Sequence, residues 1–207
     1  MAEHKPTLIE YVGPAGAGKT TLANKQASKL RSRDYSVMTA YYFQQNKGIF
    51  ILFFLLSPIF IVLRFKLFKS VYLSLKKEIS LLQKLNSFLN TYYLLYKLNF
   101  LILIAKRKNI DYIIFDQGIV QKLCGQSINP ESIDGGCMQQ ITDLRNNYIV
   151  YYVKGDIEDI VTRRSKRKKP IDIGKSQKGI EKEILLFEHS LYTVQKKYDL
   201  HIKRIAN

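Results

Sequence analysis

Cysteine is scarce in this chain of 207 residues, which has only Cys124 and Cys137. The two lie 13 positions apart, with no histidine or third cysteine nearby. That spacing fits neither a zinc site nor a disulfide framework, so it indicates a reduced, intracellular setting. Residues 1–6 lack the apolar core of a signal peptide, and strand-like sequence begins directly after them. We therefore expect no leader segment and a cytoplasmic location.

Acidic residues are also few: 17 Asp and Glu accompany 33 Lys and Arg, for a formal net charge of +16. Such a balance suits nucleotides, nucleic acid or an acidic membrane surface as partners, and it does not choose among them. A solvated basic face is the simpler explanation for many of these lysines. Hydrophobic residues make up 46% of the chain, enough for one sizeable core with an inserted subdomain.

No apolar run is long enough to cross a bilayer as a helix. The longest, residues 49–63, has fifteen residues without a charge, whereas a spanning helix needs ~20. Pro58 near its middle would also break or kink a helix. Three interpretations stay open for this run: a buried helical element of an inserted subdomain, a peripheral membrane anchor with a basic flank, or a surface that binds a protein partner.

What the sequence does contain is a glycine-rich stretch at 13–21, GPAGAGKTT, which fits the pattern G-x-x-x-x-G-K-[ST]. A strand-like run (Thr7–Val12) precedes it and a helix-like run (Lys19–Arg31) follows it, which is the context of a phosphate-binding loop. Backbone N–H groups of such a loop and the N-terminus of the next helix approach a polyphosphate closely. Lys19 would reach the β and γ phosphates of ATP, and the Thr20 hydroxyl would hold Mg²⁺. The predicted nucleotide-binding residues are Gly13, Ala15, Gly16, Ala17, Gly18, Lys19, Thr20 and Thr21.

The remaining pattern predicts an α/β fold. Residues 35–42 are expected to form a second strand, parallel to the first because a helix connects the two. Later strands are expected at 111–116, 148–153 and 200–205, and later helices at 131–145 and 178–197. Between the second and third strands, residues 70–105 carry a helical stripe that ends near the basic residues 106–108. We assign this stripe to core packing, and its members are Leu75, Ile79, Leu82, Leu89, Tyr93, Tyr96 and Phe100.

Asp116 is the second candidate site residue, because it ends the apolar run YIIF. Ligands of open parallel sheets bind outside the carboxyl ends of the strands, where the glycine-rich loop also lies. An acid there would orient Mg²⁺, directly or through water, or accept a proton from an acceptor group. The simpler alternative is a solvated aspartate that opens a turn.

Basic residues cluster at 163–169, on a helix that Asp156 can cap. Arg163 and Arg167 are four positions apart, so they would share one helix face. Guanidinium groups stabilise the charge that develops in phosphoryl transfer, so Arg163, Arg164 and Arg167 are candidate catalytic residues. A solvated basic run, or nonspecific nucleic-acid binding, is the alternative.

Together, GPAGAGKTT, the apolar strand that ends in FDQG and the RRSKR run resemble the P-loop nucleoside and nucleotide kinases, most closely the thymidylate-kinase-like group. The resemblance implies one P-loop domain over residues 1–207, with a central parallel sheet of about five strands between two helical layers. It also implies a helical, partly very apolar insert at about 46–108 that contributes to the acceptor site, and a lid-like basic segment at about 156–179. Family members commonly have Asp-Arg after the third core strand, where this chain has Asp116 and Gln117.

The predicted function is Mg-dependent phosphoryl transfer from ATP to a small-molecule acceptor such as a nucleoside or nucleotide. The alternative is a nucleotide-gated switch or scaffold that contacts a membrane or a protein through residues 49–63. A GTPase or a transporter-type ATPase fits less well, because N-K-x-D, D-x-x-G and L-S-G-G-Q are missing at suitable positions. A nucleic-acid end kinase ranks last, and specific nucleic-acid binding is not expected, since the sequence supplies no base-reading module.

Overall fold

The fold is organised around a five-stranded parallel sheet in the order β2-β3-β1-β4-β5. The computed structural model describes residues 5–40, 80–125, 147–166 and 176–206. The strands are β1 (Thr7–Val12), β2 (Val37–Thr39), β3 (Tyr112–Phe115), β4 (Tyr148–Lys154) and β5 (Ile202–Ala206). The helices described are α1 (Lys19–Arg31), α5 (Leu81–Arg107), α6 (Ile119–Leu123), α8 (Ile157–Ser165) and α9 (Gln177–Tyr198). The sequence prediction of an α/β fold with a central parallel sheet of about five strands is confirmed.

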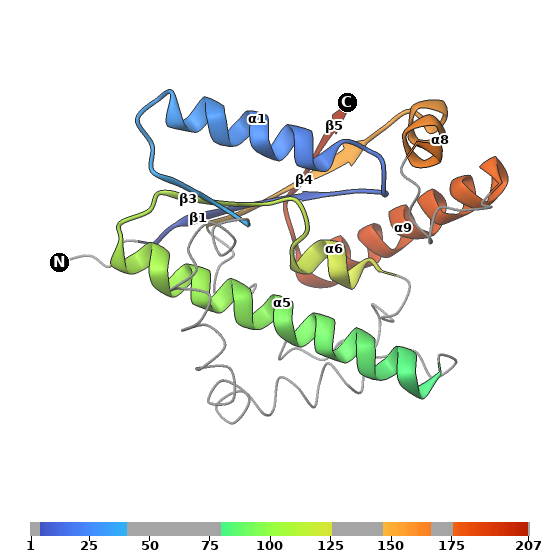
Figure 1. The fold of residues 1–207 in the computed structure, drawn as a ribbon, viewed down its shortest axis with the longest axis horizontal. Helices are drawn as coiled ribbons and strands as arrows, with labels where there is room; N and C mark the ends of the chain where they lie inside the picture. The colour runs from blue at the N-terminus through green and yellow to red at the C-terminus, as the bar shows by residue number, and fades with distance from the viewer. Residues whose placement is uncertain (1–4, 41–79, 126–146, 167–175, 207) are drawn as a thin grey trace.

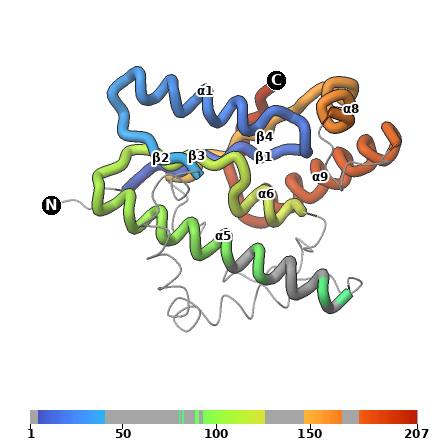
Figure 2. The backbone as a smooth tube through the Cα atoms, in the orientation of Figure 1, coloured from blue at the N-terminus to red at the C-terminus, as the bar shows by residue number. Residues whose placement is uncertain are grey.

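Helices cover both faces of this sheet, as Figure 1 shows, with α1 on one face and α5, α6 and α9 on the other. The alternation of side chains along β1 explains the two layers. Leu8 and Val12 belong to the apolar core beneath α5, α6 and α9. Ile9 and Tyr11 point the other way, into the core formed with α1 and α8. β1 lies at the centre of the sheet, between β3 and β4 (Figure 2), and is covered by helices on both faces.

Most predicted elements are present with small changes at their ends. The first strand and first helix match the predicted bounds, and Asp156 caps α8 by accepting hydrogen bonds from Glu158 N (2.8 Å) and Asp159 N (3.4 Å). The second strand is shorter than predicted, and the third and last strands begin one or two residues later. The predicted helix at 131–145 and the apolar run at 49–63 lie outside the described residues.

The predicted core stripe of α5 is only partly correct. Tyr96 and Phe100 are buried, but Leu82, Leu89 and Tyr93 are exposed by 79%, 51% and 41%. A helix of 27 residues is about 40 Å long, whereas the longest strand, with seven residues, spans about 23 Å. The C-terminal half of α5 lies near the sheet, and its N-terminal half diverges from the sheet (Figure 1). Within the part of the chain that the structure describes, no helix has the length and apolarity needed to cross a membrane.

Candidate functional site

The glycine-rich loop joins the end of β1 to the start of α1 and has the backbone that its glycines predict. Gly13, Gly16 and Gly18 have φ values of 151°, 92° and 88°. Gly18 is the N-cap of α1 in the left-handed conformation, which a residue with a Cβ adopts only at a cost. The loop thus turns directly into a helix N-terminus, where N–H groups and the helix dipole favour an anion.

Lys19 lies back over this loop. Its Nζ donates hydrogen bonds to the carbonyl oxygens of Gly13 (2.7 Å) and Pro14 (2.8 Å), and the residue is only 9% exposed. A buried ammonium group is costly unless it has hydrogen-bond partners, and these two carbonyls supply them. The ammonium is therefore held at the loop that would bind phosphate.

Asp116 and Thr20 are brought together from positions 96 residues apart. The Thr20 hydroxyl donates to Asp116 Oδ2 at 2.7 Å. They meet because β1 and β3 are parallel neighbours, so the residues after their carboxyl ends share one edge of the sheet. The two residues predicted to hold Mg²⁺ thus lie in direct contact.

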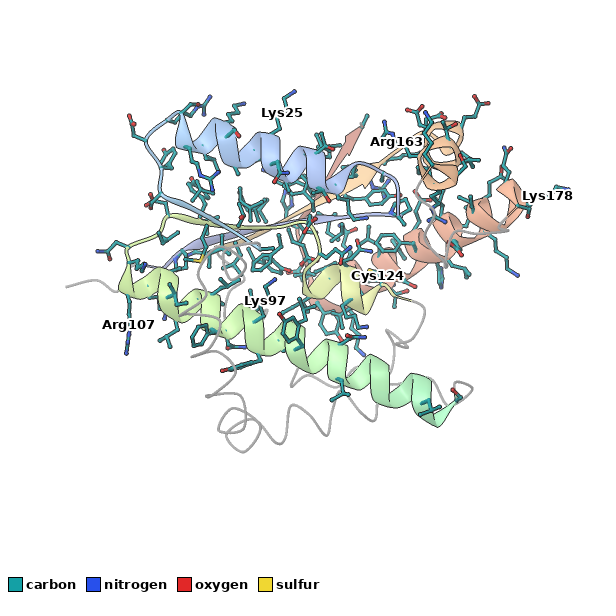
Figure 3. All side chains as sticks on the ribbon, in the orientation of Figure 1. Lys25, Lys97, Arg107, Cys124, Arg163 and Lys178 are labelled. Atoms are coloured by element: carbon teal, nitrogen blue, oxygen red, sulfur yellow. The ribbon has the colours of Figure 1, made fainter. Side chains whose placement is uncertain are left out.

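The arginines of α8 contact carbonyl oxygens of the glycine-rich loop. Arg164 is 4% exposed, and its Nε donates to the Ala15 carbonyl at 2.9 Å while its Nη1 pairs with Glu183 of α9 at 2.8 Å. Arg163, labelled in Figure 3, is less buried and donates to the Gly16 carbonyl at 3.3 Å. Both side chains therefore bind the loop itself. Arg167 lies outside the described residues.

A pocket of about 570 Å³ opens beside Asp116. Its walls come from α5, the turn after β3 and α6, and its polar lining includes Lys97, Asp116, Gln117, Gln121 and Lys122. Lys97 rises from α5 on the side that faces the sheet (Figure 3). Burial lowers the pKa of both lysines, and for Lys97 the charge of Asp116 opposes that shift. The lining of the pocket thus includes two basic side chains and one carboxylate.

Several residues of this region were missed by sequence reasoning. Glu10 was visible as the one charge in the strand TLIEYV, but nothing in the sequence pointed to its partners. No sequence motif marks Gln121 or Glu183 as a site residue, because each acts through a hydrogen bond to a separate segment of the chain. Lys97 was assigned to no role, since a lysine on a helix usually faces solvent.

The comparisons with known proteins give fold-level likeness only. No family model and no curated protein matches the chain. The chain is similar to a structure of deoxyadenosine kinase from M. mycoides with dCMP and dCDP bound, with 18% identity over 96% of this chain and 89% of that chain, at a TM-score of 0.49. A structure of the same kinase with dATP bound has 19% identity, covers 96% and 90%, and has a TM-score of 0.46. YorR from Bacillus subtilis, in complex with phosphorylated GDP, has 18% identity, covers 97% and 85%, and has a TM-score of 0.46.

At these identities and TM-scores, the likeness carries no conclusion about the site.

Proposed function

We propose that this protein binds ATP and transfers a phosphoryl group, with Mg²⁺, to a small-molecule acceptor such as a nucleoside or nucleotide. The observation that carries this proposal is that Asp116 contacts both the glycine-rich loop and the adjoining pocket. Its carboxylate accepts a hydrogen bond from Thr20 of the phosphate loop and also lines the adjoining pocket. A donor held by the loop and an acceptor held in the pocket would therefore meet at one carboxylate.

The donor nucleotide would lie with its phosphates on residues 13–21. Lys19 would bind the β and γ phosphates, which would replace the two carbonyl oxygens that it contacts in this structure. Arg163 and Arg164 would keep the loop in place through Gly16 and Ala15. These groups position the phosphates and offset their charge, which is the main task of a protein in phosphoryl transfer.

Mg²⁺ fits the oxygen donors at Thr20 and Asp116, because it prefers a hydroxyl or carboxylate together with phosphate oxygens and water. Among residues 5–40, 80–125, 147–166 and 176–206, no group of three or more His, Cys, Asp or Glu side chains could hold a metal ion. On this proposal Mg²⁺ arrives with the nucleotide. When bound, it would offset the charge of the phosphates.

The acceptor would lie in the pocket between α5 and α6. Asp116 would orient its hydroxyl or phosphate, or take its proton. Lys97 and Lys122 give this pocket positive charge that residue 117, a glutamine, does not provide. An acceptor that already carries an anionic group would therefore be favoured. On this proposal residues 46–108 are an insert that forms the acceptor side, and residues 156–179 are a lid with Arg163, Arg164 and Arg167 as its cations.

The proposal is tested by conversion of Mg-ATP to ADP with and without pooled nucleosides, nucleotides, sugars and other small acceptors. Stimulation by one pool establishes a kinase, and subdivision of that pool identifies its acceptor. Nucleotide binding that requires Lys19, with no stimulation by any pool, contradicts the kinase and favours a nucleotide-gated switch that acts through residues 49–63. Flotation with anionic liposomes, with and without that segment, then tests the switch.

Asp116→Asn is expected to lower turnover by about 10²-fold, the scale of losing one preorganised electrostatic group. The amide keeps the size of the side chain and can still accept from Thr20, but it loses the charge that would hold Mg²⁺ or a proton. The rate is measured against Mg²⁺ concentration. Asp34→Asn, which neutralises an exposed carboxylate in the turn after α1, is the control and should leave the rate unchanged. Wild-type turnover in Asp116→Asn would remove this residue from the mechanism.

A further inference from the structure

Glu10, in the centre of β1, is a fully buried carboxylate with 0% exposure. Alternation along the strand places it on the face of Leu8 and Val12, toward α6. Burial raises the pKa of Glu10, and the hydrogen bonds of its carboxyl oppose that shift. Burying an ionisable group of this kind costs several kcal/mol unless hydrogen bonds compensate. Its partners therefore show what the residue holds in place.

Those partners are the N-terminus of α6 and one tyrosine. Oε1 accepts from the N–H groups of Gly118 (3.0 Å) and Gln121 (2.8 Å). Oε2 accepts from Val120 N (3.2 Å) and from the Tyr148 hydroxyl of β4. The N-cap of α6, Gly118, makes no side-chain cap of its own. Glu10 thus supplies the cap from 108 residues earlier in the chain.

Gly118 leaves the space that this carboxyl occupies. A Cβ on residue 118 would lie 2.4 Å from Glu10 Cδ, closer than any real contact allows. The turn that follows Asp116 is therefore fitted to the carboxyl of β1, and Asp116 is two residues from this contact. Glu10 itself does not line the pocket in which Asp116 lies.

Gln121 connects the buried carboxyl to the phosphate loop. Its backbone N–H donates to Glu10 Oε1 at 2.8 Å. Its side-chain Oε1 accepts from Gly13 N, also at 2.8 Å. Gly13 is the first residue of the loop, and Gln121 and its neighbour Lys122 line the adjoining pocket. One residue of α6 is thus in contact with Glu10, with the loop and with the pocket.

We propose that Glu10 is a positioning residue that fixes α6 against β1, and through Gln121 fixes both Gly13 of the phosphate loop and the α6 wall of the pocket. It acts from inside the core and touches neither phosphate nor acceptor. The positioning role follows from the hydrogen bonds of Glu10 and Gln121. Its effect on nucleotide affinity rests on the proposed function.

The test compares Glu10→Gln with Tyr148→Phe. In Glu10→Gln, an N–H₂ group replaces one of the two oxygens that accept from backbone N–H groups, so the substitution disturbs the cap of α6. Tyr148→Phe removes the hydroxyl that donates to Glu10 but leaves the three hydrogen bonds from the backbone N–H groups of α6 and its N-cap. Native-state amide exchange is measured by NMR at Gly13 and at Ile113, a buried β3 residue that reports opening of the whole sheet. In Glu10→Gln, exchange at Gly13 should rise roughly three- to tenfold more than at Ile113, the worth of one hydrogen bond. Gln121→Ala should give the same excess, and Tyr148→Phe should give none.

Equal acceleration at both amides in Glu10→Gln would show that Glu10 only stabilises the core, and would overturn the proposal. If Glu10→Gln does not fold, Glu10→Asp replaces it in the test. This variant keeps the charge but is too short to reach α6, and its exchange at Gly13 is compared with that at Ile113 in the same way. The affinity for a fluorescent ATP analogue is measured separately, and it should fall roughly three- to tenfold in Glu10→Gln and no further when Gln121→Ala is added. Absence of nucleotide binding by the wild-type chain would refute the proposed function and leave the exchange result to decide the role of Glu10.

Discussion

Lys19→Ala should lower Mg-ATP turnover by at least ~10²-fold and weaken nucleotide binding, because the substitution removes the ammonium that would stabilise charge on the β and γ phosphates. The ammonium is already held at the phosphate loop by the carbonyls of Gly13 and Pro14. Phosphate would replace these two hydrogen bonds, so the measured loss is the difference between the ammonium–phosphate and the ammonium–carbonyl contacts. ADP formation and the affinity for a fluorescent ATP analogue measure the two effects.

Lys25→Ala is the matched control for this prediction. Lys25 lies six positions later on α1, is exposed, and points away from the loop (Figure 3). Lys25→Ala removes one positive charge, as Lys19→Ala does, but at a position that does not contact the loop. Turnover and nucleotide affinity should therefore stay at the wild-type level. If Lys19→Ala and Lys25→Ala have the same small effect, the loop has no part in turnover. Lys19 also donates hydrogen bonds to the loop carbonyls, so its removal could unfold part of the chain. Circular dichroism of both variants shows whether a loss of turnover comes from unfolding or from loss of the ammonium group.

Arg164→Ala should lower the free energy of unfolding by about 3 kcal/mol, as measured by chemical denaturation. Removal of one partner from a buried ion pair leaves the other charge buried with less compensation, which typically costs 3–5 kcal/mol. The lower end applies because the Glu183 side chain is 23% exposed. The substitution also frees the Ala15 carbonyl, so the phosphate loop loses a contact with α8.

Arg163→Ala is the comparison for this second prediction. Arg163 makes longer contacts, 3.3 Å to the Gly16 carbonyl and 3.5 Å to Asp159, and its side chain is 40% exposed. Its loss should cost less than about 1 kcal/mol. A double-mutant cycle of Arg164→Ala and Glu183→Ala should show coupling, because the pair is in direct contact. If Arg164→Ala unfolds at the wild-type denaturant concentration but has lost turnover, its role is in the reaction and not in holding the loop.

The backbone conformation of the glycine-rich loop could be predicted from the sequence because its determinants are contiguous. The glycines that permit positive φ, the lysine and the threonine all lie within nine positions, between an apolar strand and a helix. The contact of Asp116 with Thr20 could also be anticipated, since parallel strands end at one edge of the sheet. The local sequence pattern was sufficient to predict the loop, and the direction of the parallel strands was sufficient to place Asp116 near Thr20.

The roles of the arginines and of α5 could not be settled in that way. The sequence placed Arg164 in a basic run, but whether it contacts phosphate, solvent or the loop depends on α9, which brings Glu183 to it. Periodicity identified α5 as a helix, yet which of its residues are buried depends on the angle at which it crosses the sheet. Both features depend on how far separate elements extend and where they meet.

The sequence by itself therefore determined the α/β class, the conformation of the glycine-rich loop and the position of the acid at the end of β3, because each depends on neighbouring residues or on strand direction. The tertiary structure alone decided the pocket beside Asp116, the pairing of Arg164 with Glu183, and the contacts of Glu10 and Gln121. These contacts join residues separated by up to 138 positions, and no periodicity or local propensity encodes which distant N–H or carbonyl a side chain will meet. The physical reason is packing: a buried charge must find partners, and only the folded chain decides which groups are close enough to serve.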